Sequence, residues 1–108
     1  MTEFTMEEMQ SMQRALQQRY RHRWEPIGPE AGKHKLLWLM GELGEVIDIV
    51  KKNGDEAACT DPAPREALVE ELADVLMYYN DVLLCYGISP QELKAAYRRK
   101  FERNMDRW

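Results

Sequence analysis

Four carboxylates at helical spacing are the residues of this chain best suited to chemistry. Glu42 and Glu45 stand three positions apart, and Glu71 and Asp74 repeat that spacing further along. On a helix, positions i and i+3 lie on one face, so each pair would project two carboxylates in one direction. Four carboxylates from two facing helices form an all-oxygen site of the kind that suits Mg²⁺ or Mn²⁺. The spacing therefore predicts a divalent-metal site between two helices.

The surroundings of the two pairs favour this interpretation over a solvated helix face, which is where Glu and Asp usually lie. Apolar side chains flank the acids on nearly every side in residues 36–50 and 68–84. A helix that is apolar almost all round is buried in a core or an assembly. A bare charge in such a place is costly, and no Lys or Arg lies close to the acids on those faces. A bound metal is the simplest way to compensate them.

The two acidic segments carry a family resemblance. Residues 41–45 (GELGE) and 71–76 (ELADVL) look like the two halves of the motif of MazG-like nucleoside triphosphate pyrophosphohydrolases, and the similarity covers residues 24–108. This all-α group includes dimeric dUTPases and dCTP pyrophosphatases. The resemblance implies Mg²⁺-dependent hydrolysis of a (d)NTP to a (d)NMP and pyrophosphate, with house-cleaning of the nucleotide pool as a candidate role. All four acids would hold metal, and Glu42 or Glu45 could instead act as the general base.

The resemblance also implies contacts to the nucleotide. Tyr78 stands where the family has an aromatic residue that lines the nucleotide pocket, although a core tyrosine is the plainer interpretation. Trp24 matches a tryptophan that stacks on the base in the dCTP pyrophosphatase branch, and the alternative is a residue that seals the end of a bundle. Apart from the resemblance, Lys51 and Lys52 close the second helix, and either one is a phosphate ligand or simply a cation that suits the end of its helix.

The end of the chain resembles the same branch. Lys100, Asn104 and Arg107 fall on or near one face of the last helix, and Trp108 follows. The two cations would meet phosphates, whereas the Asn amide, with both a donor and an acceptor, would meet the base or sugar. The alternative is an ordinary basic helix end, which the helix dipole favours.

Helical periodicity accounts for nearly the whole chain. We expect helices over residues 6–23, 32–52, 64–86 and from 90 towards the C-terminus, with a mobile polar loop over residues 55–64. The first helix has one narrow apolar stripe, so its faces rich in Gln and Arg should be wet. No strand signal is visible. The prediction is a single domain, residues 1–108, folded as an all-α four-helix bundle.

Composition limits the partners. A chain of 108 residues, 44% of them hydrophobic, buries a limited fraction of its surface alone. Long helices that are apolar on several faces are more than one small monomer needs, so we expect a homodimer or homotetramer. The net charge of −4 argues against a nucleic-acid polymer as partner, and the chain has no apolar run long enough to span a membrane. Cys59 and Cys85 lack the spacing of a zinc site or disulfide framework. Two unpaired cysteines and an N-terminus unlike a signal peptide lead us to expect that the protein works in the reducing cytoplasm.

Several alternatives to this function follow from the same residues. A ferritin-like di-iron protein needs Glu-x-x-His, but neither His22 nor His34 lies three residues after a motif acid. A phosphoribosyl-ATP pyrophosphatase shares the helical acidic motif and differs in substrate. A catalytically silent helical oligomer that binds nucleotide or metal, or an antitoxin-like partner protein, would release no pyrophosphate from any nucleotide.

Overall fold

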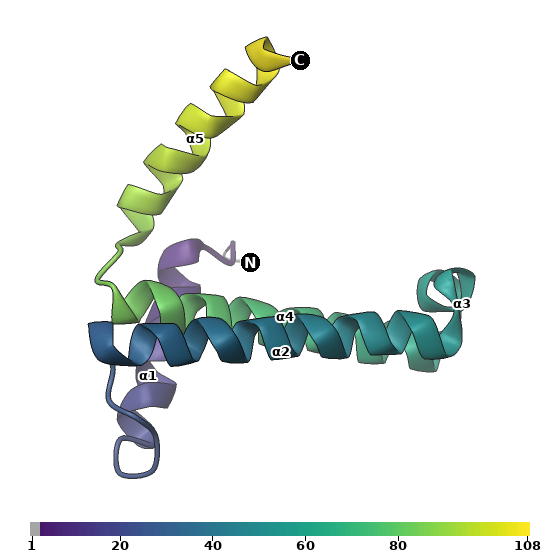
Figure 1. Ribbon diagram of the computed structural model, residues 1–108, viewed down its shortest axis with the longest axis horizontal. Helices are drawn as coiled ribbons and strands as arrows, with labels where there is room; N and C mark the ends of the chain where they lie inside the picture. Colours follow the sequence, from purple (N-terminus) through teal and green to yellow (C-terminus); the bar gives the residue numbers. More distant parts are fainter. Residues whose placement is uncertain (1–2) are drawn as a thin grey trace.

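The computed structural model describes residues 3–108, which form five helices and, within that range, no strand. In chain order the helices are α1 (Met6–Arg19), α2 (Pro29–Asn53), α3 (Asp55–Thr60), α4 (Pro62–Cys85) and α5 (Pro90–Arg107). The long helices α2 and α4 run antiparallel and side by side, α1 crosses one end of them, and α5 leaves that end at an angle (Figure 1). The predicted all-α class is confirmed, with five helices in place of four.

Local sequence signals fix most of the helix ends. The Thr5 and Ser89 hydroxyls accept the backbone N–H groups of Glu8 and Glu92, each at 3.1 Å, as expected for N-cap residues. At the end of α2, Gly54 has φ +91°, a conformation that favours glycine, and its N–H closes the helix on the Val50 carbonyl at 2.8 Å. These caps stop and start the helices close to where the sequence predicts.

The segment expected to be a loop, residues 55–64, is largely helical. It contains α3 and the first turn of α4, and α3 packs against both α2 and α4 with Ala58 buried. In the sequence, the two prolines and the lack of apolar periodicity in this segment favour a loop. Pro62 opens α4, where the missing N–H costs nothing because the first turn has no intrahelical acceptor for it.

The expectation for α1 is wrong about which face is wet. Gln10, Gln13 and Gln17 are only 6–8% exposed, whereas Met12 is 52% exposed. Each buried amide donates one hydrogen bond, Gln10 to the Ile88 carbonyl at 3.0 Å and the other two to a carboxylate of α4. A buried amide is tolerated once it is hydrogen-bonded, so the inner face of α1 is polar.

The helix α5 does not complete a four-helix bundle within one chain. It packs only against α1, where Lys94 forms an ion pair with Glu7 at 2.6 Å. Beyond that contact α5 projects from the body (Figure 1), and its apolar residues Tyr97, Phe101 and Met105 are 58–75% exposed. The predicted bundle is therefore absent from the single chain.

The α2–α4 pair also leaves much of its apolar surface open. The exposed residues on these helices are Leu36, Leu37, Trp38, Met40, Leu43, Ile47, Val69, Leu72, Leu76 and Met77. The expectation that these helices are buried on nearly all sides is thus wrong for one copy of the chain. Among the described residues, none of the helices is both long and apolar enough to cross a membrane.

Candidate active site

The antiparallel packing of α2 and α4 brings three of the four predicted acids into one cluster. Glu42, Glu45 and Glu71 each offer one carboxylate oxygen, and these atoms all lie within 4.8 Å of one another. Glu42 and Glu45 share a face because they stand three residues apart on α2, and Glu71 faces them from α4. We call these three residues the acidic trio.

Two oxygens of the acidic trio have the character of open metal ligands. Glu42 Oε2 and Glu71 Oε2 are buried and have no hydrogen-bond partner among the described residues. A buried carboxylate oxygen without a donor is costly, and native proteins normally compensate it. Carboxylate oxygens are also the donors that Mg²⁺ and Mn²⁺ prefer. The residues therefore fit a hard divalent cation.

The electrostatics of the trio agree with this fit. Burial raises the pKa of Glu42 to about 7, and the neighbouring Glu45 and Glu71 add to the rise. Burial likewise raises the pKa of Glu71, with further contributions from Glu45 and Asp74. Without a cation the cluster therefore holds protons more tightly than isolated carboxylates do, and a cation would displace them.

Asp74, the fourth predicted ligand, stands outside the trio but close to it. It is half-buried on the same side of α4, three residues after Glu71, and its charge contributes to the raised pKa of that residue. It also lines the cavity that adjoins the trio. Asp74 thus connects the acidic cluster with the cavity.

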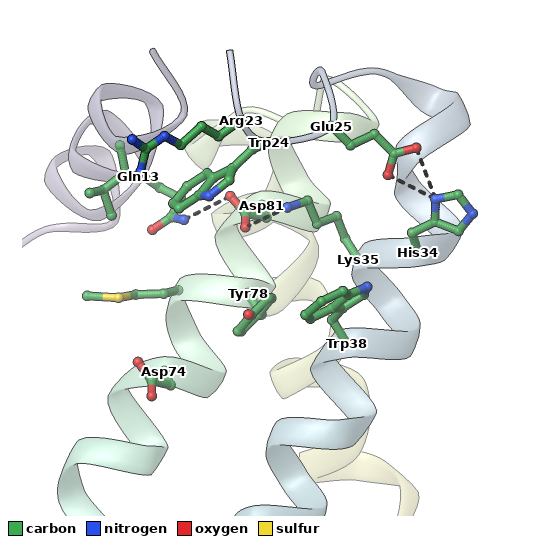
Figure 2. Close-up of a pocket in the computed structure, with 12 residues that line it drawn as sticks. Gln13, Arg23, Trp24, Glu25, His34, Lys35, Trp38, Asp74, Tyr78 and Asp81 are labelled. Carbon is green, nitrogen blue, oxygen red and sulfur yellow. Dashed lines mark hydrogen bonds and ion pairs between the residues drawn. The ribbon is translucent and has the colours of Figure 1, made fainter. Parts of the chain in front are cut away.

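This cavity, of about 420 Å³, lies between α1, α2, α4 and the segment that joins α1 to α2 (Figure 2). Its aromatic wall includes the rings of Trp38 and Tyr78, which stack with centroids 6.3 Å apart. Trp24, 38% exposed, lines the opposite part and stacks on Tyr20 at 4.8 Å. The predicted nucleotide contacts Trp24 and Tyr78 thus share one cavity beside Asp74.

Deeper in the cavity is a polar network that the sequence did not predict. Lys35 of α2 approaches Asp81 of α4 at 3.5 Å, and the Asp81 carboxylate accepts hydrogen bonds from Gln13 at 2.8 Å and Gln17 at 2.9 Å. Lys35 and Asp81 stand seven residues from Glu42 and Asp74, which on a helix means the same face two turns away. The seven-residue spacing could have placed Lys35 and Asp81 near the site from the sequence alone. Nothing in the sequence indicates that Gln13 and Gln17 of α1 bind Asp81.

Four of the predicted substrate contacts lie apart from the acidic trio. Lys52 is exposed near the end of α2, on the side of the trio away from the cavity. Lys100, Asn104 and Arg107 are on α5, which packs against α1 and against no other helix. Within one chain these residues and the acids do not meet.

The fold and the site define an all-helical protein with two long antiparallel helices. These helices carry a cluster of carboxylates that could hold a metal ion, next to a cavity with aromatic walls. A family model described as the MazG nucleotide pyrophosphohydrolase domain matches residues 30–106. The chain therefore belongs to the MazG nucleotide pyrophosphohydrolase family, which confirms the resemblance of its acidic motifs. Comparison with curated proteins and with solved structures found no match.

Proposed function

We propose that this protein is a Mg²⁺-dependent nucleoside triphosphate pyrophosphohydrolase that converts a (d)NTP to the (d)NMP and pyrophosphate. The observation that carries the proposal is the acidic trio, with two buried carboxylate oxygens that lack partners, in a chain of this family. Of the alternatives, a phosphoribosyl-ATP pyrophosphatase would use the same acids on a different substrate.

Glu42, Glu45, Glu71 and Asp74 would hold the ion or ions. When bound, Mg²⁺ or Mn²⁺ would neutralise phosphate oxygens and lower the pKa of a coordinated water. The protein must also supply a proton acceptor for the attacking water, and Glu42 or Glu45 takes that role. Whichever of the two takes this role would do so in place of binding the ion, because a carboxylate that is coordinated to a cation is a weaker base.

The cavity would receive the nucleoside. Asp74 and Tyr78 both line it, so a triphosphate held at the acids extends its base between Trp24 and the Trp38–Tyr78 pair. Aromatic faces stack well on bases of any identity. Burial raises the pKa of Tyr78, with help from the charges of Glu42 and Asp81, so its hydroxyl stays protonated and can donate a hydrogen bond.

The working unit would be a homodimer or homotetramer. Leu37 and Met40 on α2, both more than 60% exposed, belong to a wide apolar surface of the kind that a second copy covers. Because α5 projects away from its own body, Lys100 and Asn104 would act on a triphosphate bound to a partner copy. Lys52, beyond the trio, remains a candidate phosphate ligand.

Pyrophosphate release from a panel of nucleotides tests the proposal. Canonical and modified nucleoside triphosphates and phosphoribosyl-ATP are each supplied with Mg²⁺ and, in parallel, with excess chelator. We expect turnover of at least one triphosphate, its loss in chelator, and its loss in Glu42→Gln and Glu71→Gln. Glu66→Gln, on the exposed surface of α4, is the matched control and should keep its activity. Full activity in chelator would contradict metal dependence, and no release from any nucleotide would favour a catalytically silent oligomer.

A further inference from the structure

Side chains of α2 and α4 face one another in three successive layers along the helix pair. The first layer is the acidic trio. The second is the stacked pair Trp38–Tyr78, and the third is the ion pair Lys35–Asp81, both drawn in Figure 2. At a rise of 1.5 Å per residue, the third layer lies roughly 10 Å along the helices from the first. The aromatic layer separates the two charged ones.

Lys35 has hydrogen-bonding capacity that the protein does not use. Its side chain is only 13% exposed, yet its ammonium group makes no hydrogen bond to any other residue in the range 3–108. Its contacts are the ion pair with Asp81 at 3.5 Å, which is long for a hydrogen bond, and the Trp24 ring, whose centroid is 5.8 Å away. The ammonium group carries three donors and lines the cavity.

Asp81 forms the ion pair with this ammonium group and is itself hydrogen-bonded by two side chains of α1. It is 3% exposed, and one of its oxygens accepts both Gln13 and Gln17 while the other faces Lys35. Two further carboxylates line the cavity: Glu25 is already engaged by His34 at 2.9 Å, and Asp74 lies at the other end, next to the acidic trio. Lys35 is therefore a buried donor available at this end of the cavity, where Arg23, which is exposed, is the other cation of the lining.

We propose that Lys35 is a specificity-determining residue, which donates a hydrogen bond to a carbonyl oxygen of the nucleobase, and that Asp81 and Gln13 position it. This inference rests on the proposed function, because it takes the phosphates to be bound at the acidic trio. With the phosphates there, the third layer is too far along the helices to serve them and faces the far edge of the base. Pyrimidines and 6-oxopurines present a carbonyl oxygen to a donor, whereas adenine has none.

Adenine nucleotides would then be the disfavoured substrates. Adenine offers only ring-nitrogen acceptors, flanked by an amino group or a ring C–H, so a donor placed for a carbonyl oxygen meets it less well. Sites built to hydrogen-bond a substrate group discriminate strongly against analogues that lack it. For the wild-type protein we expect kcat/KM to be about tenfold or more higher for at least one carbonyl-bearing nucleotide than for ATP.

The decisive variant is Lys35→Met in the full-length chain, with KM and kcat measured by pyrophosphate release for CTP, UTP, GTP and ATP. We expect KM for the preferred nucleotide to rise about tenfold, kcat to change less than about threefold, and kinetics with ATP to stay the same. Lys35→Arg keeps the donors and should recover much of the preference. Lys33→Met is the control for a lost charge, because Lys33 is exposed on the same helix.

Other outcomes overturn the inference. A wild-type protein that prefers ATP, or a Lys35→Met variant that loses the same factor with every nucleotide, would mean that Lys35 has a structural or phosphate-binding role. If no nucleotide is hydrolysed, the proposed function fails first, and calorimetric binding of CMP, UMP, GMP and AMP then tests the inference separately. A preference for a carbonyl-bearing monophosphate that Lys35→Met abolishes would support it, and equal binding of all four would overturn it.

Discussion

Glu42 is the residue at which the stability of the fold is coupled to protonation and, if the proposed metal site is right, to metal binding. Its pKa in the folded protein is about 7, against an ordinary value of 4.5, because it is buried beside two other carboxylates. The folded state therefore binds this proton more tightly than the unfolded chain does. The stability linked to the proton is fully present below about pH 4.5 and is lost as the pH rises through about 7.

A pH series of thermal unfolding in chelator should reveal this linkage. Glu42→Gln mimics the protonated side chain, so its Tm should match that of the wild type near pH 4 and exceed it by a few degrees near pH 8. Saturating Mg²⁺ at pH 8 should raise the Tm of the wild type well above that of the variant, since the ion binds the ionised carboxylates of the folded state. Glu70→Gln, exposed on α4, is the control. A difference between wild type and Glu42→Gln that does not change with pH would contradict the shifted pKa.

For the helices, the sequence predicts the spacing of residues within each helix but not the hydrogen bonds that join one helix to another. The four acids were found because their spacing along each helix is visible in the chain. The Gln13–Asp81 hydrogen bond joins residues 68 positions apart, and no pattern of apolar and polar residues in the sequence predicts it. The apolar stripe of α1 suggested the wrong inner face, because the buried contacts of that helix are amide hydrogen bonds to α4. A proline is ambiguous in a sequence because it can interrupt a helix or begin one, and Pro62 begins α4.

The polar face of α1 should therefore contribute to stability. Gln13→Ala removes one of the two amides that satisfy the buried carboxylate of Asp81. We expect the free energy of unfolding to fall by about 1–3 kcal/mol, the usual cost of leaving a buried polar group short of a partner. Gln18→Ala, on the exposed face of the same helix, should change it by less than about 0.5 kcal/mol. Urea denaturation measures both, and equal values would mean that the network adds nothing to the fold.

At the scale of the whole molecule, two exposed apolar surfaces lead us to predict that copies of the chain associate. The α2–α4 pair exposes a broad apolar surface, and α5 presents a second one away from the body (Figure 1). The charges of the two parts are complementary: α5 carries six Lys and Arg against three Asp and Glu, while the protein as a whole has a net charge of −4. These features favour α5 of one copy against the acidic body of another.

Sedimentation at micromolar concentration tests whether copies associate. We expect at least a dimer for the wild type, because covering the apolar face of α2 and α4 removes a large area from water. Met40→Glu, at a position 68% exposed in the single chain, should shift the protein towards monomer, since a charge would be buried in the interface. Lys33→Glu makes a larger charge change on an exposed part of the same helix and should leave assembly unchanged. A stable wild-type monomer at this concentration would contradict the prediction.

A complementation experiment tests whether α5 acts on the partner copy. Truncation after Phe101 removes Asn104 and Arg107 but should leave the fold intact, because α5 contacts the body only through α1. Alone, the truncated chain should have a strongly raised KM, and full-length Glu42→Gln should be nearly inactive. In a dimer of the two, the intact acids of the truncated chain would meet the intact α5 of the other, which restores one complete site.

Co-expressed at equal amounts, the chains should recover about a quarter of wild-type activity per chain at low substrate, since half of randomly formed dimers are mixed and each has one such site. Activity no greater than the average of the two separate variants would mean that α5 serves its own chain or that the nucleotide is recognised without it.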